Sequence, residues 1–289
     1  MKLKSLQKFF FLIACAVTFS AQAQSQTGKL NLKKGQKVQV DNSLKSTISM
    51  EMMGQSMDMN SDGTMFYKVE VKEKKDTSYN ISSTLTKMVT TGSMMGQSYS
   101  FDSDNKKDLD SSDMGKMLKG ELNVAKDVEL NSYGQLVNQK EAEVSADGSA
   151  NPMMDMMKNM SGAGAAFSSV TEVFQALPST PKPGDTWSDS IIIEGVKTYR
   201  TYTVKEISNN IASLTLTGNQ STNKTIQQAG SEVTLSMQAK LTGESKVDVT
   251  TGTVQEKTFT MEGSGTADAM GQSIPLTMKV TSVTKVKSL

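Results

Sequence analysis

Methionine is the residue type whose number and spacing could carry chemistry in this chain. The sequence contains 21 methionines, which cluster at residues 50–65, 94–95 and 153–160. Thioether sulfurs can bind soft Cu(I). They also fill broad, adaptable apolar surfaces, either as core or as the lining of a site for ligands of varied shape. The candidate residues are Met50, Met52, Met57, Met59, Met153, Met156, Met157 and Met160.

Three interpretations of these clusters are open: core packing, an apolar-ligand site and Cu(I) binding. Each cluster falls on the predicted apolar face of its own strand or helix, which favours packing over a dedicated copper tract. As the functional alternative we expect an apolar small molecule, or a docked envelope protein, to contact these side chains. We expect no catalytic residue, no metal site and no cofactor.

The composition excludes several classes of enzyme. The chain has no His and a single Cys, Cys15. A Ser-His-Asp triad, a Cys-His dyad and His-ligated zinc therefore cannot form. Glu51 and Asp58 could share a cation or act as an acid/base pair, but a solvated pair screened by salt is favoured. A Ser-Lys or carboxylate hydrolase stays open as an alternative.

Residues 1–23 have the three parts of a secretory signal peptide. Three lysines at positions 2, 4 and 8 precede an apolar run over residues 9–19, and residues 20–23 (Ser-Ala-Gln-Ala) offer a small-x-small cleavage site. This run is too short to span a bilayer, which takes about 20 residues. We therefore expect an exported protein, periplasmic or extracellular, without a transmembrane segment. The alternative is a lipoprotein acylated at Cys15.

The charge of the mature chain is nearly balanced. The whole chain has 31 basic and 30 acidic residues, so loss of three lysines leaves 28 against 30, a net charge of −2. A balanced chain lacks the basic surface that nucleic acid requires. We expect no nucleic-acid partner.

Most of the mature sequence alternates apolar and polar residues with a period of two. Residues 233, 235, 237, 239 and 241 are apolar and their neighbours polar, and residues 274–280 repeat the pattern. Such runs predict antiparallel strands with one covered face and one solvated face.

The tetrapeptide Met-Gly-Gln-Ser occurs three times, at residues 53–56, 95–98 and 270–273. A two-residue turn with Gly-Gln at its centre would suit a type II′ hairpin. This register predicts the opposed pairs Met52/Met57, Met50/Met59, Glu51/Asp58, Met94/Tyr99, Ala269/Ile274 and Ala267/Leu276.

Helical patterns are confined to the middle of the chain. Residues 152–160 carry methionines at helical spacing after Asn151 and Pro152, which can begin a helix. A second helix is predicted over about 165–176, before three prolines, and a short helical stretch over 112–119.

Three landmarks recur in the same order in both strand-rich halves and predict a duplication. They are Lys33–Gly35 with Lys182–Gly184, Val71–Glu73 with Val204–Glu206, and Val128–Gly134 with Val247–Gly252. We expect a first β-rich half (24–150), a helical connector (151–178) and a second β-rich half (179–289).

The segment Leu177–Trp187 (LPSTPKPGDTW) resembles the hallmark of an uncharacterised family of exported proteins of Bacteroidetes-type bacteria, known only as a domain of unknown function. The resemblance implies an envelope location and a β-rich fold, and it brings no activity. Pattern and resemblance together predict a mainly β fold. Antiparallel hairpins would form a curved sheet with a barrel-like or sandwich core, as two pseudo-repeated halves around a short central helical segment.

Overall fold

The computed structural model describes residues 28–52, 55–94, 96–137, 170–193, 195–228, 231–269 and 272–289. The strands are β1 (Lys37–Met52), β2 (Gln55–Lys74), β3 (Ser78–Met94), β4 (Gln97–Asp102), β5 (Ala125–Asn131), β6 (Leu136–Val137), β7 (Thr186–Ile193), β8 (Val196–Ser208), β9 (Ile211–Gln228), β10 (Ser231–Asp248), β11 (Val254–Ala269) and β12 (Gln272–Ser288). Two short helices, α1 (Lys106–Ser111) and α2 (Asp113–Leu118), follow β4.

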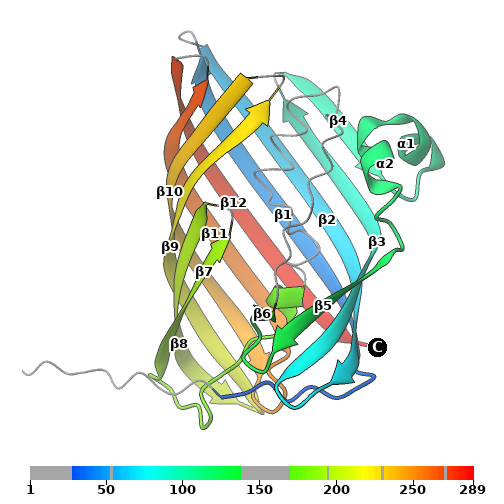
Figure 1. Ribbon diagram of the computed structural model, residues 1–289, viewed down its shortest axis with the longest axis vertical. Helices are drawn as coiled ribbons and strands as arrows, with labels where there is room; N and C mark the ends of the chain where they lie inside the picture. The colour runs from blue at the N-terminus through cyan, green and yellow to red at the C-terminus, as the bar shows by residue number, and fades with distance from the viewer. Residues whose placement is uncertain are drawn as a thin grey trace, which may run out of the picture.

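These strands form one antiparallel sheet, which confirms the predicted fold class. The order along the sheet is β6-β5-β3-β2-β1-β12-β11-β10-β9-β8-β7, with β4 beside β3. The first strand pairs with the last over residues 38–50 of β1, so strands from both ends of the chain meet in the middle of the sheet. In the described residues β6 and β7 are not paired with each other, so the sheet is open. Figure 1 shows it curled into a deep trough.

Glycines inside the strands account for much of this curvature. The inward-facing positions of β2, β3, β9, β10 and β11 include Gly63, Gly92, Gly218, Gly243, Gly263 and Gly265. A Cβ on Gly218 would lie 2.2 Å from the backbone oxygen of Tyr199, and one on Gly265 would lie 2.0 Å from that of Ser236. No L side chain fits at such distances, so glycine permits the close approach that bends the sheet.

The two-residue alternation correctly predicts the buried face. On β10, Met237, Ala239 and Leu241 are buried and the residues between them are exposed. On β12, Leu276 and Met278 are buried in the same way. These side chains face the inside of the trough.

The three Met-Gly-Gln-Ser hairpins form, but their predicted register is wrong by two residues. Met50 lies opposite Met57, Met94 opposite Gln97, and Ala269 opposite Gln272. Met-Gly, not Gly-Gln, therefore separates the paired strands. Gly96 shows the reason: it is the second residue of its turn and has φ +77°, a conformation that glycine adopts without strain. A shift of two residues preserves the face of each side chain.

Most of the predicted helical segment lies outside the described residues. This applies to the helix at 152–160 and to residues 165–169 of the second helix. The second helix was predicted to reach residue 176. Among its described residues, 170–173 are helical, and the helix ends there because Phe174 pairs with Thr253. The short helix at 112–119 is confirmed as α2. Within the described residues, the structure contains no helix with the length and apolar character needed to cross a membrane.

Landmarks of the predicted repeat adopt matching local geometry. The N–H of Gly35 donates to the carbonyl of Val71, and the N–H of Gly184 donates to that of Val204, each at 2.8 Å. Both glycines have positive φ, 83° and 92°. The strand register shifts directly after Val71 and again directly after Val204, which marks a β-bulge at the same place in each half.

Candidate functional site

A segment that we call the strap, residues 170–177, crosses the concave face at one end of the trough (Figure 1). The N–H of Gln175 donates to the carbonyl of Gly252 at 2.8 Å, and the N–H of Gly28 donates to that of Leu177 at 2.6 Å. The buried apolar residues of the strap and of the N-terminal segment beneath it are Leu30, Leu32, Val170, Val173, Phe174, Ala176 and Leu177. This end of the trough is therefore filled by the protein itself.

The other part of the concave face carries an apolar surface that we call the methionine wall. Its buried members are Ile48, Met50, Met59, Met237, Ala267, Leu276 and Met278, and its half-buried members are Met57, Val233, Leu235, Met261, Ile274 and Val280. Along β12 the wall runs from Ile274 to Val280, about 20 Å at the usual rise per strand residue. It spans β2, β1, β12, β11 and β10, a width of about 19 Å at the usual strand spacing.

The structure brings together three of the candidate residues from the sequence. Met50 and Met57 are directly opposed, and Met59 is opposite Ile48. Met237 from β10 and Met278 from β12 complete the same cluster, although more than 170 residues separate them from Met59 in the chain. The first methionine cluster is thus joined to side chains that the sequence pattern did not link to it.

The remaining candidates are placed less fully. The backbone of Met52 pairs with that of Gln55, while its side chain lies outside the described part of the structure. Met153, Met156, Met157 and Met160 lie outside the described residues as well.

Glu51 and Asp58 are not directly opposed, contrary to the predicted register. Glu51 faces Ser56, and Asp58 faces Ser49, whose hydroxyl donates to the Asp58 carboxylate at 2.6 Å. Both acids are exposed on the outer face of the hairpin. The two-residue slip of the turn separates them, and each is solvated.

A partly buried charge cluster links the strap to the sheet beside the methionine wall. Arg200 makes two parallel hydrogen bonds to Asp189, from Nε and one Nη, each 2.8 Å long. The hydroxyl of Tyr202 approaches the same carboxylate at 3.5 Å. On the strap, Glu172 pairs with the Lys257 ammonium of β11 at 2.5 Å, and the Lys257 side chain is only 7% exposed.

Burial and mutual pairing set the protonation states of this cluster. Burial alone would raise the pKa of Glu172, but the Lys257 charge and hydrogen bond, with a contribution from Arg200, lower it below its ordinary value. Burial raises the pKa of Tyr202, so its hydroxyl stays protonated. Burial alone would lower the pKa of Arg200, but its interactions with Tyr202, Asp189 and Glu172 raise it. The cluster thus holds two cations and two anions that neutralise each other.

The sequence contained a signal for this cluster that pattern reasoning missed. Arg200 is the only arginine in the chain; the other 30 of the 31 basic residues are lysines. It also occupies an inward position of its strand, between the outward Tyr199 and Thr201. Arginine is suited to paired hydrogen bonds with a carboxylate, so a single inward arginine predicts a buried pair.

Asp189 and Arg200 are directly opposed on neighbouring strands. The same row of opposed residues continues across the sheet through Gly218, Leu241 and Met261. Met261 is a half-buried member of the methionine wall. The charge cluster therefore borders the wall on the side of the strap. Because its charges are already paired with one another, it offers no net charge to a ligand.

Comparison with known proteins gives a family and distant structural likenesses. A family model described as a family of unknown function (DUF6263) matches residues 76–254. No curated protein matches the chain. A structure titled "Lipid-protein interactions in lipovitellin" has a TM-score of 0.48 and 11% identity; the similarity covers 89% of this chain and 25% of that one.

An outer membrane channel from Pseudomonas putida F1 has a TM-score of 0.25 and 11% identity, over 90% of this chain and 98% of the channel. OccK7 (OpdD) of Pseudomonas aeruginosa has a TM-score of 0.23 and 5% identity, over 89% of this chain and 100% of that chain. Likenesses at this level assign no function.

Proposed function

The chain belongs to the DUF6263 family, whose function is unknown, and we propose that it is an exported, non-enzymatic protein that binds the acyl chain of a lipid on its concave face. The observation that carries this proposal is the methionine wall. It is a continuous apolar cluster of buried and half-buried side chains, about 20 by 19 Å, that strands from both ends of the chain build together. Its length is comparable with that of a long-chain fatty acid.

The side chains of the wall suit an adaptable apolar ligand. Thioethers are flexible and polarisable, so they fit ligands of varied shape better than branched side chains do. Small residues accompany them: Gly263 and Gly265 on β11, Ala239 on β10 and Ala267 on β11. These small side chains keep this part of the wall close to the backbone.

The charge cluster and the strap give the ligand a direction. The strap fills one end of the trough, and the neutral cluster beside it presents no unpaired charge to a head group. The acyl chain would therefore enter with its apolar end toward the strap. Its polar head group would stay at the opposite end of the wall, near the turns between β1 and β2 and between β11 and β12.

Chain-length dependence tests this proposal directly. Each methylene buried on the wall contributes about 0.8 kcal/mol, or roughly fourfold in affinity. Delipidated protein is titrated with fatty acids from octanoate to tetradecanoate, in competition with fluorescent cis-parinaric acid. We expect affinity to rise several-fold with each added methylene until the wall is covered. An affinity that does not depend on chain length contradicts the proposal.

A pair of variants separates the concave face from the convex face. Ala239 is 5% exposed and faces Gly263 inside the trough, so Ala239→Phe fills part of the wall. Ser264→Phe places the same side chain on the exposed face of β11. We expect at least a tenfold loss of fatty-acid affinity for Ala239→Phe and little change for Ser264→Phe, with urea midpoints measured for both. Equal affinities in two folded variants would rule out the wall as the site.

Export is part of the proposal and has its own test. Mass spectrometry of protein purified from the producing cell identifies the mature N-terminus. We expect cleavage after Ala23, which leaves Gln24 first and removes Cys15. An acylated Cys15 would instead identify a lipid-anchored protein, and an intact Met1 would contradict export.

A further inference from the structure

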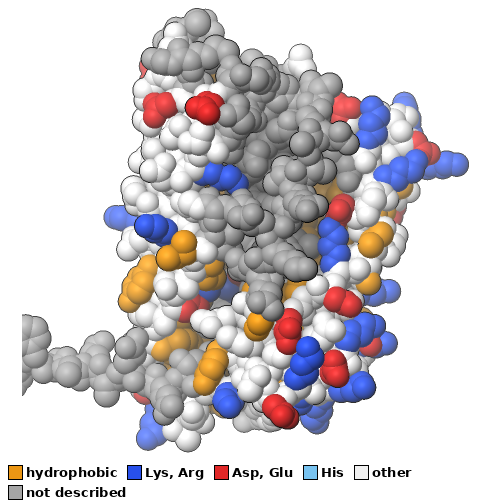
Figure 2. All heavy atoms as spheres, in the orientation of Figure 1, with side chains coloured by type: hydrophobic (Ala, Val, Ile, Leu, Met, Phe, Trp, Pro, Cys, Tyr) orange, Lys and Arg blue, Asp and Glu red, His pale blue; other side chains and the backbone are white. Residues whose placement is uncertain are grey.

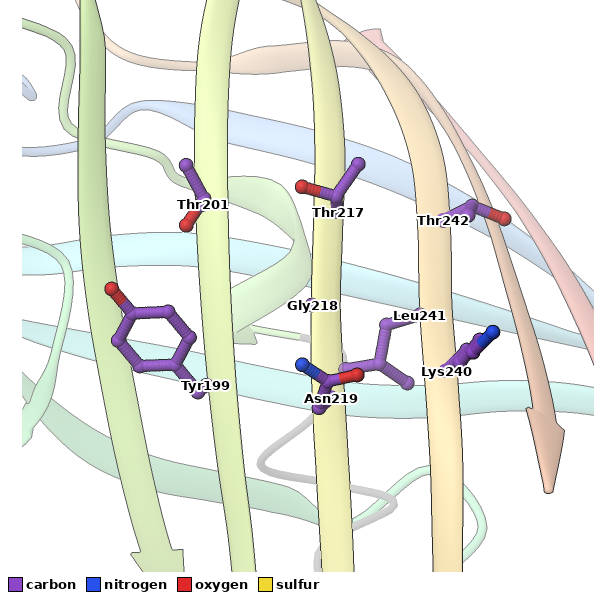
Figure 3. A pocket seen from close by; sticks show the side chains of 8 residues that line it. All are labelled: Tyr199, Thr201, Thr217, Gly218, Asn219, Lys240, Leu241 and Thr242. Carbon is purple, nitrogen blue, oxygen red and sulfur yellow. The ribbon is translucent and has the colours of Figure 1, made fainter. Parts of the chain in front are cut away.

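The convex face has a hollow of about 300 Å³ over β8, β9 and β10, on the opposite side of the sheet from the methionine wall. Figure 3 shows Tyr199, Asn219 and Lys240 across its lower part and threonines of the three strands above them, with Gly218 between. Tyr199, Asn219 and Lys240 are directly opposed in neighbouring strands. Thr201, Thr217 and Thr242 form the next row in the same way.

An exposed aromatic ring stands at one side of this hollow. Tyr199 is 53% exposed, and Ile192 on the neighbouring β7 is 69% exposed. Ile192 is two residues beyond Ser190, which is directly opposite Tyr199, so the two side chains are diagonal neighbours on one face. Figure 2 shows hydrophobic side chains on the surface over β7 and β8. A tyrosine on an ordered strand presents a rigid apolar ring at low entropic cost.

The polar groups of the hollow are not engaged with one another. In the described residues, Asn219, Thr217 and Thr242 have no side-chain hydrogen bond, whereas their neighbours on the same face do. Gln238 donates to Ser221 at 2.9 Å, and Thr225 and Thr234 lie 3.0 Å apart. The Thr201 hydroxyl lies 3.0 Å from the Ser188 hydroxyl. The Asn219 amide and the hydroxyls of Thr217 and Thr242 therefore offer donors and acceptors outward, at the spacing of about 4.8 Å between strands.

We propose that this hollow binds a pyranose unit of a saccharide chain. A pyranose has an apolar C–H face, which would stack on Tyr199, and a rim of hydroxyls that both donate and accept hydrogen bonds, as the threonine hydroxyls and the Asn219 amide do. An apolar ligand would leave those groups unpaired, at a cost in free energy. A nucleic acid would require several cations, and Lys240 is the single cation of the hollow. The volume matches the lower end of small-molecule sites.

A titration with four soluble tetrasaccharides tests the proposal on the whole mature protein. Cellotetraose, maltotetraose, laminaritetraose and tetra-N-acetylchitotetraose are each titrated by calorimetry and followed by saturation-transfer NMR. We expect at least one to bind with a Kd below about 10 mM, and Tyr199→Ala to weaken it about tenfold, the loss of one aromatic contact. If none of the four binds, the proposal is overturned.

The chain supplies a matched control for Tyr199. Tyr133 is 46% exposed and lies in the turn between β5 and β6, away from the hollow. Tyr133→Ala removes an equally exposed tyrosine and is expected to leave saccharide affinity unchanged. Asn219→Ala is expected to weaken binding several-fold without moving the urea midpoint, because Asn219 is exposed and has no partner in the described structure. Equal losses in the Tyr199 and Tyr133 variants would overturn the proposal.

Discussion

The ion pair between Glu172 and Lys257 connects the strap to the sheet, and its loss should be costly. Glu172→Gln removes the carboxylate but leaves the Lys257 ammonium, whose side chain is 7% exposed, without its partner at 2.5 Å. Removing one partner of a buried pair typically costs 3–5 kcal/mol. Glu172 itself keeps 25% of its side-chain exposure, which admits water to the site. We therefore expect the lower end of that range, about 3 kcal/mol of unfolding free energy.

Urea denaturation followed by tryptophan fluorescence measures this loss. Trp187 is the only tryptophan of the chain, is 5% exposed and stacks on Tyr202 of the charge cluster with ring centroids 5.3 Å apart. Its emission therefore reports unfolding near the pair. The double variant Glu172→Gln/Lys257→Met removes both charges and should recover most of the lost stability. A cost below about 1 kcal/mol for the single variant, or a double variant no more stable than the single one, would refute the reasoning.

The same pair predicts a dependence on pH with a defined sign. The fold lowers the pKa of Glu172, so the pair contributes fully above the ordinary glutamate pKa of about 4.3 and is lost as pH falls through the lowered value. The difference in unfolding free energy between wild type and Glu172→Gln should therefore be constant near neutral pH and shrink below about pH 4. A difference that grows as the pH falls would show that the carboxylate is not stabilised as a charge.

Three further predictions concern stability and use the same denaturation measurement. Arg200→Lys should lower the unfolding free energy by about 1–2 kcal/mol, because one ammonium cannot make both parallel hydrogen bonds to Asp189. An unchanged urea midpoint would mean that the paired geometry contributes nothing to stability. Gly265→Ala should lower the unfolding free energy by about 3 kcal/mol or prevent folding, since its Cβ would lie 2.0 Å from the backbone oxygen of Ser236. The control Gly120→Ala places a Cβ that has no neighbour within 4 Å, so its stability should be unchanged or slightly raised. Gln175→Met should stabilise by less than about 1 kcal/mol, because it removes the buried Nε2, which has no hydrogen-bond partner in the described structure, but also the Oε1 that accepts a long hydrogen bond of 3.5 Å from the Ser245 hydroxyl. Clear destabilisation would show that the bond to Ser245 outweighs the unpaired Nε2.

The faces of the strands could be predicted from the sequence because a single rule governs them. Alternation put Met237, Ala239 and Leu241 on one side of β10, and no tertiary contact is needed to see it. The mainly β fold class followed for the same reason. The local match of Gly35 with Gly184 was also visible, since each glycine is needed where φ is positive.

Register and strand neighbours could not be predicted in the same way. Glycine fits either central position of a two-residue turn, so composition does not choose between a Gly-Gln turn and a Met-Gly turn. The two turns give strand registers that differ by two residues. The pairing of β1 with β12 joins segments more than 220 residues apart. Every strand here alternates in the same way, so the pattern carries no information about which strands are neighbours.

The candidate site was predicted in part, for a related reason. Alternation places Met50, Met57 and Met59 on one face, but only the sheet order brings Met237 and Met278 beside them. The inward Arg200 and Lys257 were readable from the same alternation. They were overlooked because charged residues on strands are usually solvated, and the strap that covers them belongs to the part predicted to be helical.

Gly218 is a position where the concave and convex faces depend on each other. Its inward Cβ would lie 2.2 Å from the backbone oxygen of Tyr199, so Gly218→Ala must move β8 away from β9. That shift would displace Tyr199 on the convex side and Arg200 on the concave side, because the two are adjacent in β8. We expect the folded variant to bind both saccharide and fatty acid less well, whereas Tyr199→Ala affects saccharide alone and Ala239→Phe affects fatty acid alone. A folded Gly218→Ala protein that keeps both affinities would show that the bend at this glycine positions neither site.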